Sequence, residues 1–216
     1  MDKEEFLCQE KYRENSYKLL SECYYVPEAG LLAVLNSLDN SIGRLSSEIA
    51  KSVPPMTDLE SLKIDYARLF VGPYRLLAPP YGSVYMEKNR MLMGDSTIDV
   101  KHRYAEEGLE ISLKETPDHI SIELEFMYFL IFKEIETLSN DDINRGIDYL
   151  QKQKIFLEIH LGAWVSEFSR NIGDNAETDF YQRLARETQR FVLDDLSLLS
   201  EESFFDSHKF LGTVSR

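Results

Sequence analysis

Four side chains whose types could carry chemistry lie close together in the chain: Asp118, His119, Glu123 and Glu125. If this segment is helical, His119 and Glu123 are four residues apart on one face, where they could ligate a metal ion or share a proton. The spacing also fits a simpler arrangement, in which Asp118 compensates the dipole at a helix start and His119 pairs with Glu123 on the surface. We favour the simpler arrangement and predict neither a catalytic residue nor a metal site.

The motifs that mark common enzyme sites are missing from the sequence. It contains no GxxxxGK[ST], GxGxxG, GxSxG or HExxH pattern. The histidines His102, His119, His160 and His208 are scattered, so a multi-histidine metal site has little to draw on. The sequence therefore predicts a protein that is not an enzyme and carries no cofactor. A small metal-dependent hydrolase using His119 and Glu123 stays open as a distant alternative.

Apolar residues recur at helical spacing along most of the chain, and no useful strand alternation or repeat interrupts them. This periodicity predicts an all-α fold, a helical bundle in a single domain of residues 1–216. By residue number, the expected helices cover 6–24, 31–35, 42–49, 57–71, 95–107, 117–138, 142–170 and 176–199.

Three of these helices begin with capping signals. Thr57-Asp58-Leu59-Glu60 has the form of a capping box, and Asp95-Ser96-Thr97 is typical of another N-terminal cap. Thr116-Pro117-Asp118 offers a hydroxyl cap, a proline at the first helical position and an acid in the first turn. The helix behind Asp118 is apolar around most of its circumference, so we expect it to be the central buried helix.

The segment from Tyr74 to Arg90 is expected to form a long loop. No regular helix passes intact through Pro79-Pro80. The segment is rich in apolar residues for one that should lie on a surface, which makes it a candidate binding surface.

The net charge of -14, from 38 acidic and 24 basic residues, limits the partners. Such a field repels nucleic acid and anionic lipid and attracts a basic partner. Hydrophobic residues make up 43% of the chain, including 12 Tyr and 12 Phe, which suffices for a sizeable core.

Several features predict a cytoplasmic protein. Cys8 and Cys23 would lie about 22 Å apart on one helix, too far for a disulfide. The acidic N-terminus lacks the order of a signal peptide, and the longest uncharged apolar run, Phe126 to Phe132, is too short to cross a membrane. We expect neither stable membrane insertion nor nucleic-acid binding.

Five motifs follow one another in order between residues 65 and 127. They are Asp65-Tyr66, Leu69-Phe70-Val71-Gly72-Pro73, Ala78-Pro79-Pro80-Tyr81-Gly82-Ser83-Val84-Tyr85, Gly94-Asp95-Ser96-Thr97, and Pro117-Asp118-His119 with Glu123, Phe126 and Met127. Together they resemble the signatures of the TorD/DmsD/NarJ family of molybdoenzyme-maturation chaperones. The resemblance is strong over residues 57–135, whereas the terminal helices match only in length and helical pattern.

The resemblance implies an all-helical cytoplasmic chaperone that binds the twin-arginine leader of a molybdenum-cofactor oxidoreductase subunit. It would hold the apo-form until cofactor is loaded, so that premature export is avoided. Some family members have been linked to guanine-nucleotide or molybdopterin binding, so weak binding of GTP or molybdenum cofactor stays open. The family's binding determinants fall on Leu69, Phe70, Pro80, Tyr81, Tyr85, Asp118 and His119.

The chemistry of such a leader gives independent support, because it presents two guanidiniums followed by an apolar stretch. Its receptor needs carboxylates and an apolar groove. Asp118, Glu123 and Glu125 offer the carboxylates; Leu69, Phe70, Pro79, Pro80, Tyr81 and Tyr85 offer the groove.

Three questions stay open at this point. Tyr81 stands where comparable chaperones for dimethyl-sulfoxide-reductase-type enzymes tend to have tryptophan, so the client is not identified. A NarJ-like assembly chaperone for a non-exported nitrate-reductase-type subunit is the alternative function. The chain could be a monomer or a domain-swapped dimer.

Overall fold

The computed structural model describes residues 3–28, 30–31, 45, 59–73, 76–90, 92–110, 116–201 and 204. Its helices are α1 (Lys3–Cys23), α5 (Leu59–Tyr66), α6 (Gly82–Met86), α7 (Asp95–Glu106), α8 (Ile120–Ser139), α9 (Ile143–Ile159), α10 (Leu161–Asn175) and α11 (Asp179–Ser200). A π-helical turn at Ala67–Val71 and a 3-10 turn at Lys88–Arg90 complete them. Within these residues the one β feature is an isolated bridge between Tyr81 and His119, so the all-α prediction is confirmed.

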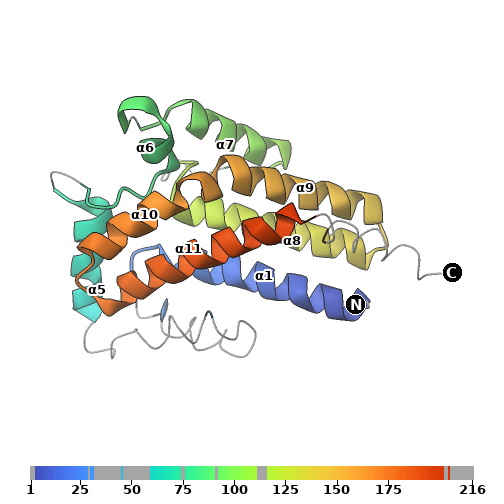
Figure 1. Ribbon diagram of the computed structural model, residues 1–216, viewed down its shortest axis with the longest axis horizontal. Coiled ribbons are helices and arrows are strands. Elements are labelled where there is room, and N and C mark those ends of the chain that lie inside the picture. Colours follow the sequence, from blue (N-terminus) through green and yellow to red (C-terminus); the bar gives the residue numbers. More distant parts are fainter. Residues whose placement is uncertain are drawn as a thin grey trace.

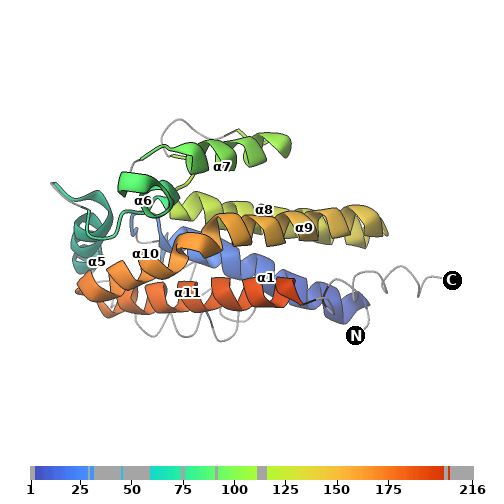
Figure 2. The same ribbon diagram turned by 45° about the horizontal axis from the view of Figure 1, so that its top comes forward.

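The long helices form a bundle whose main axis lies across Figure 1. Helix α8 packs against α1 and α9, and α11 packs against α10. In Figure 2, α7 lies on one side of the α8–α9 pair, with α1 and α11 on the other. Tyr104 of α7 contacts Phe126 of α8 and Phe156 of α9 through its ring. Helix α8 is therefore covered on both sides, as its apolar circumference predicts.

The single helix expected over 142–170 is wrong, because the chain breaks at His160. There the backbone leaves helical geometry (φ −125°, ψ −104°), and α10 begins one residue later. A Cβ on Gly162 would collide with the carbonyl oxygen of Leu157, so the approach of the two helices requires glycine. Helices α9 and α10 follow one another along the bundle (Figures 1 and 2), which is why their periodicity reads as one helix.

The remaining helix predictions have mixed outcomes. Those over 6–24, 57–71, 95–107, 117–138 and 176–199 are confirmed to within a few residues. The loop expected from Tyr74 to Arg90 is partly wrong, since α6 starts two residues after Pro80. Apart from Leu31 and Leu45, the helices expected over 31–35 and 42–49 lie outside the described residues, as does the first half of the capping box at residues 57 and 58. A single domain over 1–216 stays a prediction.

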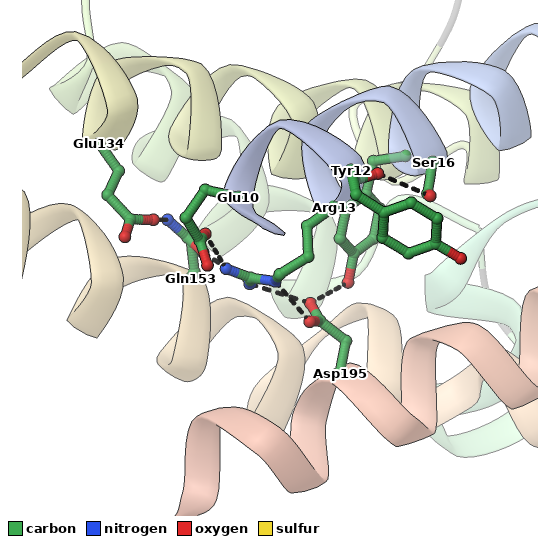
Figure 3. A network of polar contacts seen from close by, with 8 residues as sticks. Glu10, Tyr12, Arg13, Ser16, Glu134, Gln153 and Asp195 are labelled. Atoms are coloured by element: carbon green, nitrogen blue, oxygen red, sulfur yellow. Dashed lines mark hydrogen bonds and ion pairs between the residues drawn. The ribbon is translucent and has the colours of Figure 1, made fainter. Parts of the chain in front are cut away.

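A buried arginine ties the long helices together (Figure 3). Arg13 of α1 is 5% exposed. Its Nε and Nη2 donate to the two carboxylate oxygens of Asp195 on α11, at 2.7 and 3.1 Å. Nη2 also donates to Gln153 Oε1 of α9 at 2.9 Å, and Nη1 pairs with Glu10. The Tyr17 hydroxyl donates to Asp195 as well, at 2.7 Å.

The same network reaches α8 through an amide. Gln153 Nε2 donates to Glu134 Oε2 at 2.6 Å, so side chains of α1, α8, α9 and α11 share one chain of polar contacts (Figure 3). Burial raises the pKa of Glu10 well above its ordinary value, against the opposing effect of Arg13. Removing one partner of a buried ionic network leaves a charge without its counterpart, which strongly destabilises the fold. These contacts therefore hold the four helices in register.

Candidate functional site

Residues 80–83 and 117–120, from two separate motifs, are joined in what we call the clasp. Ile120 N donates to Pro80 O, and Gly82 N donates to Asp118 O, both at 2.8 Å. These bonds form the Tyr81–His119 bridge, and the two rings meet edge to face at 5.5 Å. The structure thus brings the proline-containing segment and the Pro117-Asp118-His119 turn together.

Asp118 caps a helix, but not the one that follows it. Its Oδ2 accepts a 2.8 Å hydrogen bond from Ser83 N, in the first turn of α6. The cap of α8 is His119, whose Nδ1 accepts from Ser121 N at 3.2 Å. The predicted start of α8 at Thr116-Pro117-Asp118 is therefore wrong. Burial lowers the pKa of His119 to about 4, so the ring is neutral at neutral pH and can act as this acceptor.

The expected surface pair of His119 and Glu123 is wrong, because Glu123 is fully buried. Its Oε2 accepts from Trp164 Nε1 at 3.0 Å. In the part of the chain that the structure describes, Glu123 Oε1 and Asp118 Oδ1 have no hydrogen-bond partner. A Cβ on Gly82 would lie 2.9 Å from Trp164 Nε1 and 3.1 Å from Glu123 Oε1. Gly82 of the clasp therefore packs directly against this hydrogen-bonded pair.

Burial raises the pKa of Glu123 well above its ordinary value of 4.5. The folded state then keeps a proton that the unfolded chain releases, and the free energy of unfolding falls as pH rises through this window. A glutamine at position 123 does not titrate, so this fall in the free energy of unfolding disappears, and its amide oxygen still accepts the hydrogen bond from Trp164. We expect Glu123→Gln to gain up to about tenfold in the folding constant, relative to wild type, for each pH unit in the window. Urea unfolding at pH 5 and pH 8 measures this gain.

The control for this variant is Glu125→Gln on the same helix. The Glu125 carboxylate is half-exposed and pairs with Lys18 Nζ at 3.0 Å. Its replacement should give no comparable pH-dependent gain, because this carboxylate is not buried as Glu123 is. Equal pH responses of the two variants would contradict a protonated Glu123.

Tyr85 connects the buried pair to the surface. Its ring stacks on Trp164 with centroids 5.4 Å apart and meets Phe168 edge-on at 6.1 Å. The guanidinium of Arg90 lies 5.8 Å from the centre of the Tyr85 ring. Arg90 Nη2 also lies 3.3 Å from Glu167 Oε1 on α10. An aromatic ring and an accessible carboxylate therefore stand side by side at the outer end of α6.

The predicted leader-binding residues divide into buried and accessible ones. Leu69, Phe70, Pro80, Asp118, His119 and Glu123 are buried, whereas Pro79, Tyr81, Tyr85 and Glu125 are partly exposed. The buried residues build the support, and the accessible ones lie where a peptide can reach them. Glu167 was missed by sequence reasoning, because nothing in its helical context distinguishes it from an ordinary solvated acid.

Two further acids, Asp65 and Glu87, act as caps for helices to which they do not belong. Asp65 Oδ2 accepts from Thr178 N at 2.8 Å and from Glu177 N at 3.0 Å, at the start of α11. Glu87 Oε1 accepts from Ser96 N at 2.8 Å, at the start of α7. The cap predicted at Asp95-Ser96-Thr97 is thus wrong, since the N-cap residue is Gly94 and the acceptor comes from Glu87.

Two features of the described residues bear on other functions. No group of three or more His, Cys, Asp or Glu there is arranged to hold a metal ion. Of the helices that the structure describes, none combines the length and apolar character needed to span a membrane.

The chain is similar to known proteins over most of its length. A sequence model of the family described as nitrate reductase delta subunit matches residues 30–170. The Tat proofreading chaperone DmsD of Salmonella typhimurium is 29% identical over 191 residues, 84% of this chain and 87% of that protein. The chaperone protein TorD of Vibrio atlanticus is 29% identical over 143 residues, 65% of each chain.

A solved structure shares the fold. It is a crystal structure of a protein described as a redox enzyme maturation protein, from Archaeoglobus fulgidus. The two superpose with a TM-score of 0.58 at 24% identity, covering 83% of this chain and 93% of that one.

Proposed function

This chain belongs to the nitrate reductase delta subunit family, the TorD/DmsD/NarJ family of redox enzyme maturation chaperones, and on that premise we propose that it binds a twin-arginine leader. The leader belongs to a molybdenum-cofactor oxidoreductase subunit, and binding takes place in the cytoplasm before export. The family is one of non-catalytic chaperones, so the prediction that the chain is not an enzyme is confirmed by this membership.

The observation that carries the proposal is the clasp. It joins the two motifs that the sequence singles out, and it leaves Tyr81 and Tyr85 partly exposed at the two ends of α6. Aromatic side chains of this kind can take the apolar part of a leader, while the half-exposed acid Glu167, which lies beside Tyr85 and Arg90, can take a guanidinium. Glu125 on α8 is a second half-exposed acid. The net charge of -14 would draw a basic leader to this surface and speed its capture.

A leader titration tests the proposal, and the protein supplies its own reporter. Trp164 is the only tryptophan of the sequence and stacks on Tyr85. A synthetic leader without tryptophan should bind saturably and change the Trp164 emission, because the peptide contacts the Tyr85 ring. Replacing both leader arginines by alanine should weaken binding by at least about tenfold, since two charge-assisted contacts are lost.

Two outcomes would count against leader binding. One is the absence of saturable binding by isothermal titration calorimetry as well as by fluorescence. The other is equal affinity for the native and the alanine-substituted leader, which would show that the paired arginines are not read.

The NarJ-like alternative keeps one observation in its favour, the description of the matching family as nitrate reductase delta subunit. Such a chaperone would grip the N-terminus of a nitrate-reductase-type subunit that lacks a functional export signal. Titrating both kinds of N-terminal peptide in parallel decides between the two clients by their relative affinities.

A further inference from the structure

The guanidinium of Arg90 lies between a carboxylate and an aromatic ring, a position suited to binding an arginine side chain. Arg90 Nη2 lies 3.3 Å from Glu167 Oε1, and the Arg90 Cζ atom lies over the Tyr85 ring at 5.8 Å from its centre. A carboxylate and an aromatic face are the two groups by which proteins most often recognise arginine. Tyr85 comes from α6 and Glu167 from α10, so two separate helices form the position.

The walls of this position are fixed without help from Arg90. The Tyr85 ring stacks on Trp164 with an interplanar angle of 15° and also contacts Phe168. Trp164 is fully buried and is held by its hydrogen bond to Glu123. A ring oriented by the core in this way is ready for a ligand before the ligand arrives, which reduces the entropic cost of binding.

Arg90, by contrast, is held weakly. Its side chain is 51% exposed and that of Glu167 is 44% exposed, and ion pairs between such exposed groups contribute little to stability. The Arg90 side chain can therefore leave the position at small cost.

Of the other carboxylates predicted to receive the leader arginines, Glu125 is as exposed as Glu167 but pairs with Lys18 on α1, and the remaining two are buried. Asp118 is part of the clasp and Glu123 packs against it, and each is at most 1% exposed. A guanidinium could reach them only if α6 moved away from the turn at residues 117–120. Glu167 is open to solvent and stands beside the aromatic ring, so it can accept an arginine with the clasp closed.

We propose that Tyr85 and Glu167 form a binding site for an arginine side chain of the client leader, and that Arg90 occupies this site until the leader displaces it. The inference rests on the proposed function and adds a residue, Glu167, and a competitor, Arg90, to it. Arg90 then sets a threshold, because a peptide without arginine gains too little from the site to displace it.

Arg90→Gln tests the competition, with Lys88→Gln as its matched control. Both changes remove one positive charge from the same 3-10 turn, but only Arg90 contacts Tyr85 and Glu167. Arg90→Gln should tighten binding of the native leader about two- to fivefold, the range that corresponds to losing one exposed ion pair. Lys88→Gln should give a smaller gain, arising from long-range charge alone.

A second leader locates the effect in the site. With both leader arginines replaced by citrulline, which keeps the shape and removes the charge, the advantage of Arg90→Gln over Lys88→Gln should disappear. Adding Glu167→Gln to Arg90→Gln should cancel the gain for the native leader. Thermal unfolding of each variant shows that all are folded at the temperature of the titration.

The outcomes separate this inference from the proposed function. If wild type binds the leader and Arg90→Gln behaves like Lys88→Gln, or binds more weakly, Arg90 does not compete and the inference is overturned while leader binding stands. If neither wild type nor Arg90→Gln binds the leader by calorimetry, both are overturned. Binding by Arg90→Gln alone would support a strong form of the competition.

Discussion

Arg13→Met should lower the free energy of unfolding by about 3–5 kcal/mol, the usual loss when one partner of a buried ionic network is removed. Arg13 gives hydrogen bonds to Asp195 on α11 and Gln153 on α9, and it pairs with Glu10 on its own helix. Methionine fills much of the space, yet it leaves the acids without their cation. Urea unfolding followed by far-ultraviolet circular dichroism measures the loss.

The matched control is Arg170→Met, which makes the same change at an exposed position on α10. It should alter the free energy of unfolding by less than about 1 kcal/mol. An Arg13→Met protein within that same range would show that the network does not hold the helices together.

The pH dependence of Arg13→Met distinguishes lost charge pairing from lost packing. Arg13 opposes the effect of burial on the pKa of Glu10, so without the guanidinium this carboxyl keeps its proton in the folded state to a higher pH than in wild type. The free energy of unfolding of the variant should therefore fall, relative to wild type, as pH rises from 5 to 8. A loss of the same size at both pH values would assign the effect to packing.

The helices themselves could be predicted from sequence because their apolar residues recur at helical spacing. Helix α11 and the central helix α8 were found in this way to within a few residues. The break at His160 was not, since no proline marks it and its one signal, Gly162, acts through a contact with Leu157. Periodicity reports the faces of a helix and says little about a turn between two helices that continue in one direction.

The candidate site shows the same limit for polar residues. Motif order along the chain singled out the proline-containing segment and the Asp118-His119 turn, and the structure joins these two segments. The partners of the acids could not be predicted, because each caps a helix that is distant in sequence: Asp65 caps α11 and Asp118 caps α6. A capping rule based on neighbouring residues assigns such acids to the wrong helix, and only the fold supplies the true one.

Phe70 can be interpreted either as a leader-binding residue or as a residue of the core, and the two interpretations predict different results. The resemblance places Phe70 among the leader-binding residues, whereas the structure buries it against Tyr24, Tyr66, Phe168 and Tyr181. We expect Phe70→Ala to lower the free energy of unfolding by about 3–5 kcal/mol, because the cavity cannot close around so many rigid rings. Chemical unfolding measures this loss directly.

Binding needs a milder variant, because a protein near its unfolding midpoint loses affinity for any ligand. Phe70→Leu keeps most of the volume and should cost less than about 1.5 kcal/mol. At a temperature where it is fully folded, it should bind the leader within about twofold of wild type if Phe70 only supports the site. Tyr85→Leu removes a ring that the leader can reach and should weaken binding by about tenfold, the loss expected for one aromatic contact with an arginine. If folded Phe70→Leu lost as much affinity as Tyr85→Leu, Phe70 would contact the leader itself.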